Sequence, residues 1–383
     1  MPDLASASRA TIRRLDVVGP YRGPSGYDRH TRELVRGLAG LGVQLGLLNL
    51  DGWSTPMPTE WRDPWFAWLP PTVGADTVLH FTMPSQVRAR PGVRNVNYTM
   101  FEAERIPAAW VEAAADCELV LVPTRAALDA WTTSGVPADR LRVSPLGVDG
   151  PFFSEPSCPL PFVLRDGRPV SGFGTRFLHV GELRPRKNQI GLLRAWIHAT
   201  VPDDDAVLIL KCPDVRYMVV QLAADVKALQ QELGRSLADA APVCLAPTLL
   251  SDEQMRGLYA AATHYVSMSH GEGWDQVMME AAVCGLHLIA PAHTAYLEYL
   301  DDGDAEFIPS ELGPATFEGR VGREDKMFFD GLSWWHPDER VAVEVIRGAI
   351  DGSRARHAPP SARISSTYTW PAAAQRLVEA LTA

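Results

Sequence analysis

The sequence predicts an α/β protein with two parallel-sheet domains. The chain has 383 residues, which is more than one hydrophobic core usually organises. Short apolar strands alternate with loops and helices in both halves, and this alternation is typical of parallel sheets. A stretch rich in proline and glycine, residues 150–172, has the composition of an interdomain linker. We therefore expect one domain over residues 1–165 and another over residues 166–369.

The first half opens with a strand over residues 15–19, a glycine-rich loop and a helix over residues 27–40. Ligands of parallel sheets bind beyond the carboxyl ends of the strands, and Gly26 lies there. The loop lacks the spacing of a dinucleotide fingerprint or a P-loop. A tight turn that requires positive φ would also explain its glycines. Further strands are expected over residues 43–50, 77–81, 93–99 and 120–124.

Aromatic residues are dense in the loop over residues 51–70, which contains Trp53, Trp61, Trp65, Phe66 and Trp68. Packing in the core explains most aromatic side chains. Several together in a proline-rich loop could also form an apolar platform for a sugar ring or another acceptor. The sequence leaves both interpretations open.

The second half begins with a strand over residues 175–181, followed by Arg184, Arg186 and Lys187. Asn188 can then cap a helix over residues 189–200. Cations beside a helix start can neutralise a diphosphate, although a solvated basic turn is the alternative. We expect further strands over residues 206–211, 243–246, 263–268 and 287–290, with helices over residues 215–233 and 251–262.

The stretch from Ser267 to Gly285 carries the strongest functional pattern. It predicts a strand end, a loop between Gly271 and Gly273, and a helix beginning near Asp275. Glu272 in the loop and Glu280 in the first turns of the helix can accept hydrogen bonds from sugar hydroxyls without a metal. The helix start also attracts anions.

This Glu-x7-Glu pattern, followed by Ala-Ala-x-Cys-Gly, resembles the donor-site signature of the family-4 retaining glycosyltransferases. The resemblance implies the GT-B fold, with two Rossmann-like domains facing across a cleft and a closing helix over residues 370–383 that completes the first domain. It implies a metal-independent hexosyltransferase that moves a sugar from a nucleotide-diphosphate donor to an acceptor hydroxyl. Its catalytic residues would be Lys187, which would bind the diphosphate, and Glu272, which would contact the transferred sugar. Glu280 would bind the ribose. The donor-binding residues would be Gly26, Arg184, Arg186, Gly271, Gly273, Trp274, Asp275 and Glu280.

The chain departs from the family pattern at several positions. Glu182 stands where many members have arginine, so either Arg184 or Arg186 supplies the second cation. Asp275 stands where members usually have glycine; it either alters the recognition of the donor sugar or only caps the helix. The usual histidine after the strand at residues 93–99 is absent, which leaves Thr99 and Glu102 as acceptor-side candidates.

The composition of the chain limits the kinds of binding partner and the cellular location that we expect. The net charge of -10 argues against nucleic acid. Five scattered cysteines without a Cys-x-x-Cys spacing fit a reducing cytoplasm, and residues 1–14 lack the apolar run of a secretory signal. The sequence has no uninterrupted run of 18 apolar residues, so we do not expect a membrane span. Peripheral contact with a membrane remains open. The histidines show no metal-ligand spacing, and we expect no metal and no cofactor besides the nucleotide-sugar substrate.

Two other functions remain open at the level of sequence. A catalytically silent GT-B protein that serves as a binding partner would explain Glu182, Asp275 and the missing histidine. A GT-B sugar epimerase would use the same donor site for other chemistry. For a transferase, the acceptor would be a sugar, a lipid-linked molecule or a small molecule.

Overall fold

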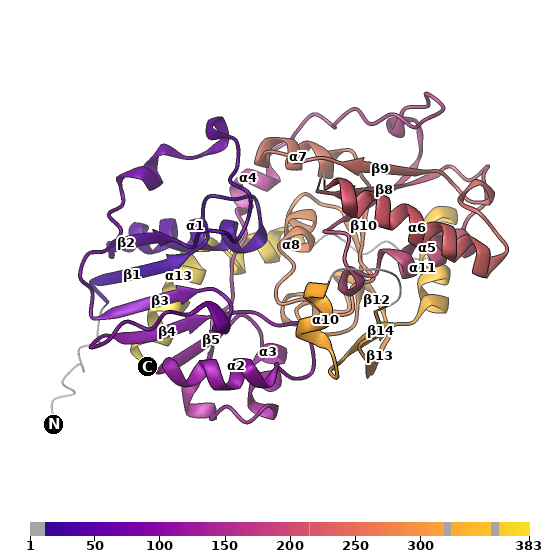
Figure 1. Ribbon diagram of the computed structural model, residues 1–383. Coiled ribbons are helices and arrows are strands. Elements are labelled where there is room, and N and C mark those ends of the chain that lie inside the picture. The colour runs from indigo at the N-terminus through magenta and orange to yellow at the C-terminus, as the bar shows by residue number, and fades with distance from the viewer. Residues whose placement is uncertain (1–11, 214, 318–322, 354–359) are drawn as a thin grey trace, which may run out of the picture. The chain divides into compact units, whose positions relative to one another are not determined.

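The computed structural model describes residues 12–213, 215–317, 323–353 and 360–383 (Figure 1). The chain forms two compact units. The first comprises the chain up to Met100, Ala108–Gly147 and Thr367–Ala383, and the second comprises Phe101–Pro107 and Val148–Ser366. The predicted linker, residues 150–172, therefore packs with the second unit, and the last helix packs with the first.

A six-stranded parallel sheet forms the centre of the first unit, in the order β2-β1-β3-β4-β5-β6. Its strands are β1 (Arg14–Gly19), β2 (Gln44–Asn49), β3 (Thr77–Phe81), β4 (Arg94–Tyr98), β5 (Leu119–Val122) and β6 (Leu141–Val143). Its helices are α1 (Gly26–Gly40), α2 (Ala108–Ala113), α3 (Arg125–Thr133) and α13 (Trp370–Thr382), and the 3-10 helices η1 (Thr59–Trp61), η2 (Pro64–Trp68), η3 (Pro84–Gln86), η4 (Ala114–Asp116) and η5 (Ala138–Arg140) lie between them.

Helix α1 begins where Ser25 caps it, with the Ser25 hydroxyl accepting a hydrogen bond from the Asp28 amide. Its apolar face buries Leu34, Val35 and Leu38. Helix α13 packs against α1, although the two are more than 300 residues apart in the chain. This contact is how the C-terminal helix completes the first unit.

A second six-stranded parallel sheet, in the order β12-β11-β10-β7-β8-β9, forms the centre of the second unit. Its strands are β7 (Thr175–Val180), β8 (Ala206–Cys212), β9 (Val243–Pro247), β10 (His264–Val266), β11 (His287–Pro291) and β12 (Ala305–Ile308). The helices are α4 (Gly150–Ser154), α5 (Gln189–Ala199), α6 (Arg216–Leu233), α7 (Asp252–Ala260), α8 (Gln276–Val283), α9 (Tyr296–Tyr299), α10 (Arg323–Phe329), α11 (Glu339–Asp351) and α12 (Ser361–Thr367). The 3-10 helices are η6 (Val170–Gly172), η7 (Pro185–Lys187) and η8 (Leu237–Asp239).

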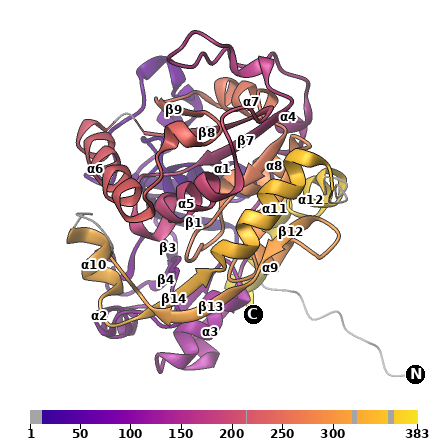
Figure 2. The same ribbon diagram turned by 90° about the vertical axis from the view of Figure 1, so that its right-hand side faces the viewer.

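The core of the second unit lies between this sheet and the helices α5 and α11, which pack side by side (Figure 2). Phe177 of β7 and Trp196 of α5 meet edge to face there, with 5.3 Å between the ring centroids. A separate antiparallel hairpin, β13 (Ser310–Pro314) and β14 (Ser333–Pro337), also belongs to this unit.

The predicted α/β class with two parallel sheets is confirmed, and most predicted elements appear with ends shifted by one or two residues. The strand predicted over residues 263–268 is shorter, because only His264–Val266 pairs with its neighbours and the chain then turns into a loop. The helix predicted over residues 251–262 ends at Ala260. The hairpin β13–β14 and α10 were not predicted.

The contact between α1 and α13 depends on a glycine. A Cβ on Gly37 would lie 2.8 Å from the Ala374 Cβ and 2.9 Å from the Trp370 carbonyl oxygen, whereas Gly40 of the same helix faces open space. We expect Gly37→Ala to lower the free energy of unfolding of the first unit by about 1–3 kcal/mol through overpacking. We expect Gly40→Ala to raise it by up to about 1 kcal/mol through helix propensity. Thermal denaturation of both variants tests this, and equal stability of the two would contradict it.

Candidate functional site

The candidate site lies at the carboxyl ends of β7 and β10 in the second unit. The chain leaves β7 into η7, which contains Arg186 and Lys187, and leaves β10 into the loop that contains Glu272. Because β7 and β10 are parallel neighbours, both loops emerge at the same edge of the sheet. In open parallel sheets this edge is where ligands bind.

Glu272 is held by two cations and a hydroxyl. The Lys187 Nζ lies 2.7 Å from Glu272 Oε1, and an Arg186 guanidinium nitrogen lies 3.1 Å from Oε2. The Ser269 hydroxyl donates to Oε1 at 2.7 Å. Burial by itself would raise the pKa of Glu272, but Lys187 and Arg186 outweigh burial and lower that pKa to about 2. Glu272 is therefore an ionised, acceptor-only group at neutral pH.

Asp275 is a second buried carboxylate next to this cluster. The Tyr296 hydroxyl donates to its Oδ2 at 2.9 Å, and the Lys187 Nζ lies 4.0 Å from Oδ1. Burial and the charge of Glu272 raise the pKa of Asp275 to about 6. Asp275 occupies the cap position of α8, but its carboxylate accepts no hydrogen bond from the first turn of that helix, all of which the structure describes. The interpretation of its side chain as a helix cap is therefore wrong.

Strained backbone surrounds the cluster. In the described part of the chain, Asn188, Asp275 and Thr294 are the non-glycine residues with positive φ, at 52°, 56° and 46°. Asn188 directly follows Lys187 and accepts from the Gly191 amide at 3.0 Å, as the predicted cap of α5. The Thr294 hydroxyl accepts from the Glu272 amide at 3.2 Å. Such conformations cost free energy and concentrate at functional sites.

The hairpin β13–β14 anchors the loop that carries Glu272. The His270 ring stacks on Trp334 with 4.7 Å between centroids and 7° between planes, and the Trp335 amide donates to the His270 carbonyl at 3.0 Å. His293 stacks on Trp335, and its Nε2 lies 3.0 Å from the Ser269 carbonyl oxygen. Burial lowers the pKa of His270 to about 4 and that of His293 to about 3, so both are neutral at pH 7. No local sequence pattern predicts this support, because only the fold brings residues 333–335 to the loop.

Glu102 packs in the second unit. Its carbonyl oxygen approaches Gly271 so closely that a Cβ there would lie 2.2 Å away. Its carboxylate lies 3.8 Å from the Arg186 guanidinium. The Glu104 amide donates to the Ser333 carbonyl at 3.2 Å. The segment Phe101–Pro107 is therefore fixed against both the Glu272 loop and the hairpin, and Gly271 is required by this close approach.

The structure separates the two arginines near η7. Arg184 pairs with Glu182 at 2.9 Å, whereas Arg186 joins Lys187 on Glu272. Arg186 also donates to the Gly271 carbonyl at 2.5 Å. Of the two candidates for a second cation, Arg186 thus lies in the cluster.

Glu280 lies on α8, almost fully buried, and accepts a hydrogen bond from the Tyr259 hydroxyl at 2.7 Å. The Trp274 side chain is 1% exposed and packs 5.4 Å from the Tyr299 ring, so it is a core side chain. Gly273, next to it, is buried in the same loop.

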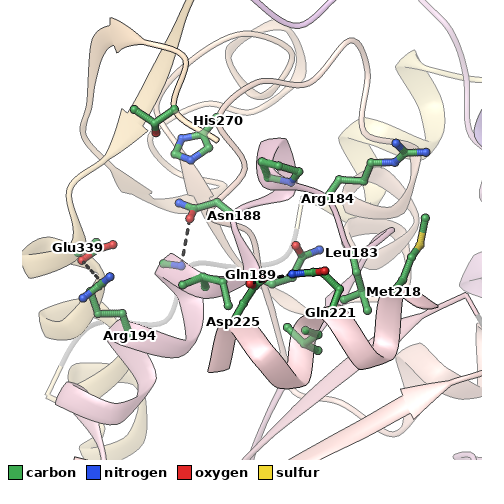
Figure 3. Close-up of a pocket in the computed structure, with 15 residues that line it drawn as sticks. Leu183, Arg184, Asn188, Gln189, Arg194, Met218, Gln221, Asp225, His270 and Glu339 are labelled. Atoms are coloured by element: carbon green, nitrogen blue, oxygen red, sulfur yellow. Dashed lines mark hydrogen bonds and ion pairs between the residues drawn. The ribbon is translucent and has the colours of Figure 1, made fainter. Parts of the chain in front are cut away.

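A small pocket of about 80 Å³ lies beside η7 (Figure 3). It is lined by Leu183, Arg184, Pro185, Asn188, Gln189, Ile190, Gly191, Arg194, Met218, Gln221, Leu222, Asp225, His270, Thr316 and Glu339. Its volume is well below the roughly 300–1,000 Å³ of common ligand pockets. It is too small to hold a whole nucleotide sugar.

Gly26 and Thr99 belong to the first unit. Gly26 starts α1, and the loop before it is fixed by Asp28, which accepts from the Gly23 amide at 2.7 Å and the Ser54 hydroxyl at 2.8 Å. Thr99 follows β4 and is fully buried. Its hydroxyl has no hydrogen-bond partner among the described residues.

The aromatic loop divides into core and surface. Phe66 is buried, whereas Trp68 is 84% exposed. Trp53 lies 4.7 Å from the Tyr27 ring and donates to the Ser25 hydroxyl at 3.1 Å, beside the start of α1.

Neither a metal cluster nor a membrane-spanning helix was found in the parts of the chain that the structure describes. No three or more His, Cys, Asp or Glu side chains there are grouped to hold a metal ion. No helix there is long and apolar enough to cross a bilayer.

Part of the sequence of the second unit matches a known family. Residues 174–321 match the model of the family described as Glycosyl transferases group 1. The matched residues include Lys187, Glu272 and Glu280. No curated protein matches the chain.

Solved structures resemble the whole chain. Anabaena HepE in complex with UDP and glucose has a TM-score of 0.59 and 14% identity, with 97% of this chain and 99% of that chain covered. Sucrose-phosphate synthase from Thermosynechococcus elongatus has a TM-score of 0.64 and 16% identity, with 96% and 98% covered. The lipopolysaccharide outer core galactosyltransferase WaaB has a TM-score of 0.59 and 12% identity, with 96% and 98% covered. At these identities the likeness establishes the fold, which is GT-B.

The raised pKa of Asp275 predicts how the free energy of unfolding depends on pH. In the unfolded chain this carboxyl has an ordinary pKa near 3.8, so the folded protein holds its proton more tightly. Asp275 therefore destabilises the fold increasingly as the pH rises from about 4 to above 6. We expect Asp275→Asn, which tolerates the left-handed backbone, to raise the free energy of unfolding by on the order of 2 kcal/mol at pH 7.5 and by less at pH 4.5.

Asp338 is the matched control for this measurement. Its carboxylate accepts from the Arg340 amide at the start of α11, and this bond lowers its pKa. Stability from Asp338 is therefore present at neutral pH and lost in acid, so Asp338→Asn should not stabilise the protein at pH 7.5. Thermal unfolding of both variants at pH 7.5 and pH 4.5 tests this prediction. A stabilisation by Asp275→Asn that is independent of pH would contradict the assignment.

Proposed function

We propose that the protein is a retaining, metal-independent hexosyltransferase that moves a sugar from a nucleoside-diphosphate donor to an acceptor hydroxyl. The observation that supports this most is the cluster of Lys187, Arg186 and Glu272 at the carboxyl edge of the second sheet. It lies within the segment matched to the glycosyl transferases group 1 family. It combines the cations that a leaving diphosphate needs with a carboxylate that a sugar hydroxyl can bind.

In this reaction the bond from the anomeric carbon to the diphosphate oxygen breaks, and negative charge builds up on the diphosphate. Lys187 and Arg186 would stabilise that charge, which removes the need for a metal ion. The acceptor oxygen bonds to the anomeric carbon on the same face, and its proton leaves with the diphosphate. The chain would supply charge and position, with no covalent intermediate on the protein.

Donor binding would redistribute the contacts of the cluster. Lys187 and Arg186 are paired with Glu272 in this structure, so a diphosphate would compete for the same cations. Glu272, which is ionised in the unliganded protein because Lys187 and Arg186 lower its pKa, would then accept hydrogen bonds from the transferred sugar. Glu280 would accept from the ribose. The UDP and UDP-glucose complexes of HepE make UDP sugars the first donors to test.

The acceptor would be a sugar, a lipid-linked molecule or a small molecule that contacts the first unit. The buried Thr99 hydroxyl, with no partner among the described residues, supports its role as an acceptor contact. Glu102 packs in the second unit beside Arg186, and we propose that it orients that guanidinium. The scattered cysteines, none of them in a disulfide in the described part of the chain, support a cytoplasmic location.

A catalytically silent binding protein is the second candidate function. The contact between Glu182 and Arg184 favours it, because an acid stands where the family usually has arginine and pairs with a neighbouring cation. Such a protein would bind the nucleotide sugar and release no sugar from it. Measuring sugar release therefore separates the two functions.

Binding and transfer are tested with UDP, GDP and ADP and their glucose or mannose derivatives. A ligand at about a hundred times its dissociation constant adds about 2.7 kcal/mol of stability, which corresponds to a rise in Tm of several degrees. We expect one nucleotide to raise the Tm, and Glu280→Gln to weaken its binding by about tenfold through the lost charge-assisted bond. We expect Lys187→Ala to lower the rate of sugar transfer by about 10²–10³.

Lys227→Ala is the control for charge loss, because Lys227 is an exposed residue of α6. It should leave binding and transfer unchanged. Full transfer activity of Lys187→Ala would contradict the proposed mechanism. The absence of any Tm shift across the panel would contradict the donor site itself.

A further inference from the structure

A buried carboxamide begins the helix that follows Asp275. Gln276 is the first residue of α8 and is 8% exposed. Neither its Oε1 nor its Nε2 has a hydrogen-bond partner among the described residues. A buried amide that leaves both a donor and an acceptor unmatched carries a desolvation cost, and such groups in folded proteins require an explanation.

The chain shows how a buried glutamine at the same helical position is normally satisfied. Gln189 is the first residue of α5 and is 5% exposed, and it lies beside the pocket in Figure 3. Its Nε2 donates to the Glu182 carbonyl at 2.6 Å and lies 3.5 Å from the His179 Nε2. Among the residues that the structure describes, the Gln276 amide has no such hydrogen bonds, so its burial is not explained by its position at a helix start.

The position of Gln276 indicates what its amide could bind. Residues four apart on a helix lie on the same face, so Gln276 shares a face of α8 with Glu280. Asp275 directly precedes Gln276 in the chain, and the Asp275 carboxylate accepts a hydrogen bond from Tyr296 and none from the start of α8. Gln276 thus lies at the start of a helix, where anions are attracted. In the chain it lies between the loop that contains Glu272 and the helical residue Glu280.

A carboxamide is satisfied by a ligand that both accepts and donates a hydrogen bond. An anion without a proton, such as sulfate, would satisfy Nε2 but would leave Oε1 unmatched. A nucleotide sugar offers both partners close together, since its diphosphate oxygens only accept and its ring hydroxyls also donate. The order of groups along such a donor, sugar then diphosphate then ribose, follows the order Glu272, Gln276, Glu280 along the chain.

We propose that Gln276 is a specificity-determining residue that binds the nucleotide-sugar donor, with Nε2 donating to the diphosphate and Oε1 accepting from a hydroxyl of the transferred sugar. This inference rests on the proposed function.

The test uses the full chain, UDP and UDP-glucose, or the nucleotide pair that the panel above identifies. Gln276→Leu removes both polar atoms at similar volume. We expect it to weaken nucleotide-sugar binding by about tenfold or more, measured by calorimetry, because the donor loses two hydrogen bonds. We also expect the Tm of the unliganded variant to rise by about 2–4 °C, because the unmatched amide is gone.

The two remaining variants separate a binding role from a structural one. Gln276→Glu keeps an oxygen acceptor but replaces the donor, so it should weaken binding of the nucleoside diphosphate most strongly through charge repulsion. Gln189→Leu removes an amide that is bonded, so the Tm of the unliganded protein should fall.

The outcomes distinguish this inference from the proposed function. If the wild-type protein binds none of the nucleotides, the proposed function fails and this inference fails with it. If the wild type binds and Gln276→Leu binds equally well, the inference alone is overturned. A lower Tm of unliganded Gln276→Leu would also overturn it, because the amide would then stabilise the free protein.

Discussion

The contact between Lys187 and Glu272 is the interaction on which the rest of the site depends. A buried ion pair is favourable only when its charges are fully bonded, because desolvation of both groups is costly. The carboxylate of Glu272 meets this condition through Arg186 and the Ser269 hydroxyl, in addition to Lys187. Burial and the neighbouring charge of Glu272 raise the pKa of Asp275, whereas Lys187 and Arg186 lower the pKa of Glu272. The cluster therefore brings two cations into direct contact with buried carboxylates at one edge of the sheet.

Holding this cluster imposes constraints over a wide part of the second unit. Three non-glycine residues in the described chain adopt left-handed backbone, and each lies in or beside the cluster. Gly271 is required because the Glu102 carbonyl passes against it. The hairpin β13–β14 then fixes the loop by stacking Trp334 and Trp335 on His270 and His293. The strain is retained because packing on several sides determines the loop's path.

Local patterns in the sequence were sufficient to predict the two sheets and to single out Lys187 and Glu272, which the structure brings into contact. Lys187 and Glu272 each follow an apolar strand and precede a helix, so their place at one sheet edge follows from the parallel topology. The sequence could not show whether Arg184 or Arg186 joins the cluster, since this depends on the turn of η7. Glu102 and the hairpin were missed in their supporting role, because contacts across more than 60 residues leave no local periodicity. Asp275 was placed correctly at the helix start, but the direction of its side chain depends on Tyr296, which the sequence does not link to it.

The most direct measurement is a crystal structure of the protein with the nucleotide sugar that binds it. The central claim is that the cations now held by Glu272 are the binding site of the donor diphosphate. We expect diphosphate oxygens within about 3 Å of the Lys187 Nζ and the Arg186 guanidinium, with Glu272 turned to a hydroxyl of the sugar. A donor bound elsewhere, with the 2.7 Å contact between Lys187 and Glu272 unchanged, would contradict the account.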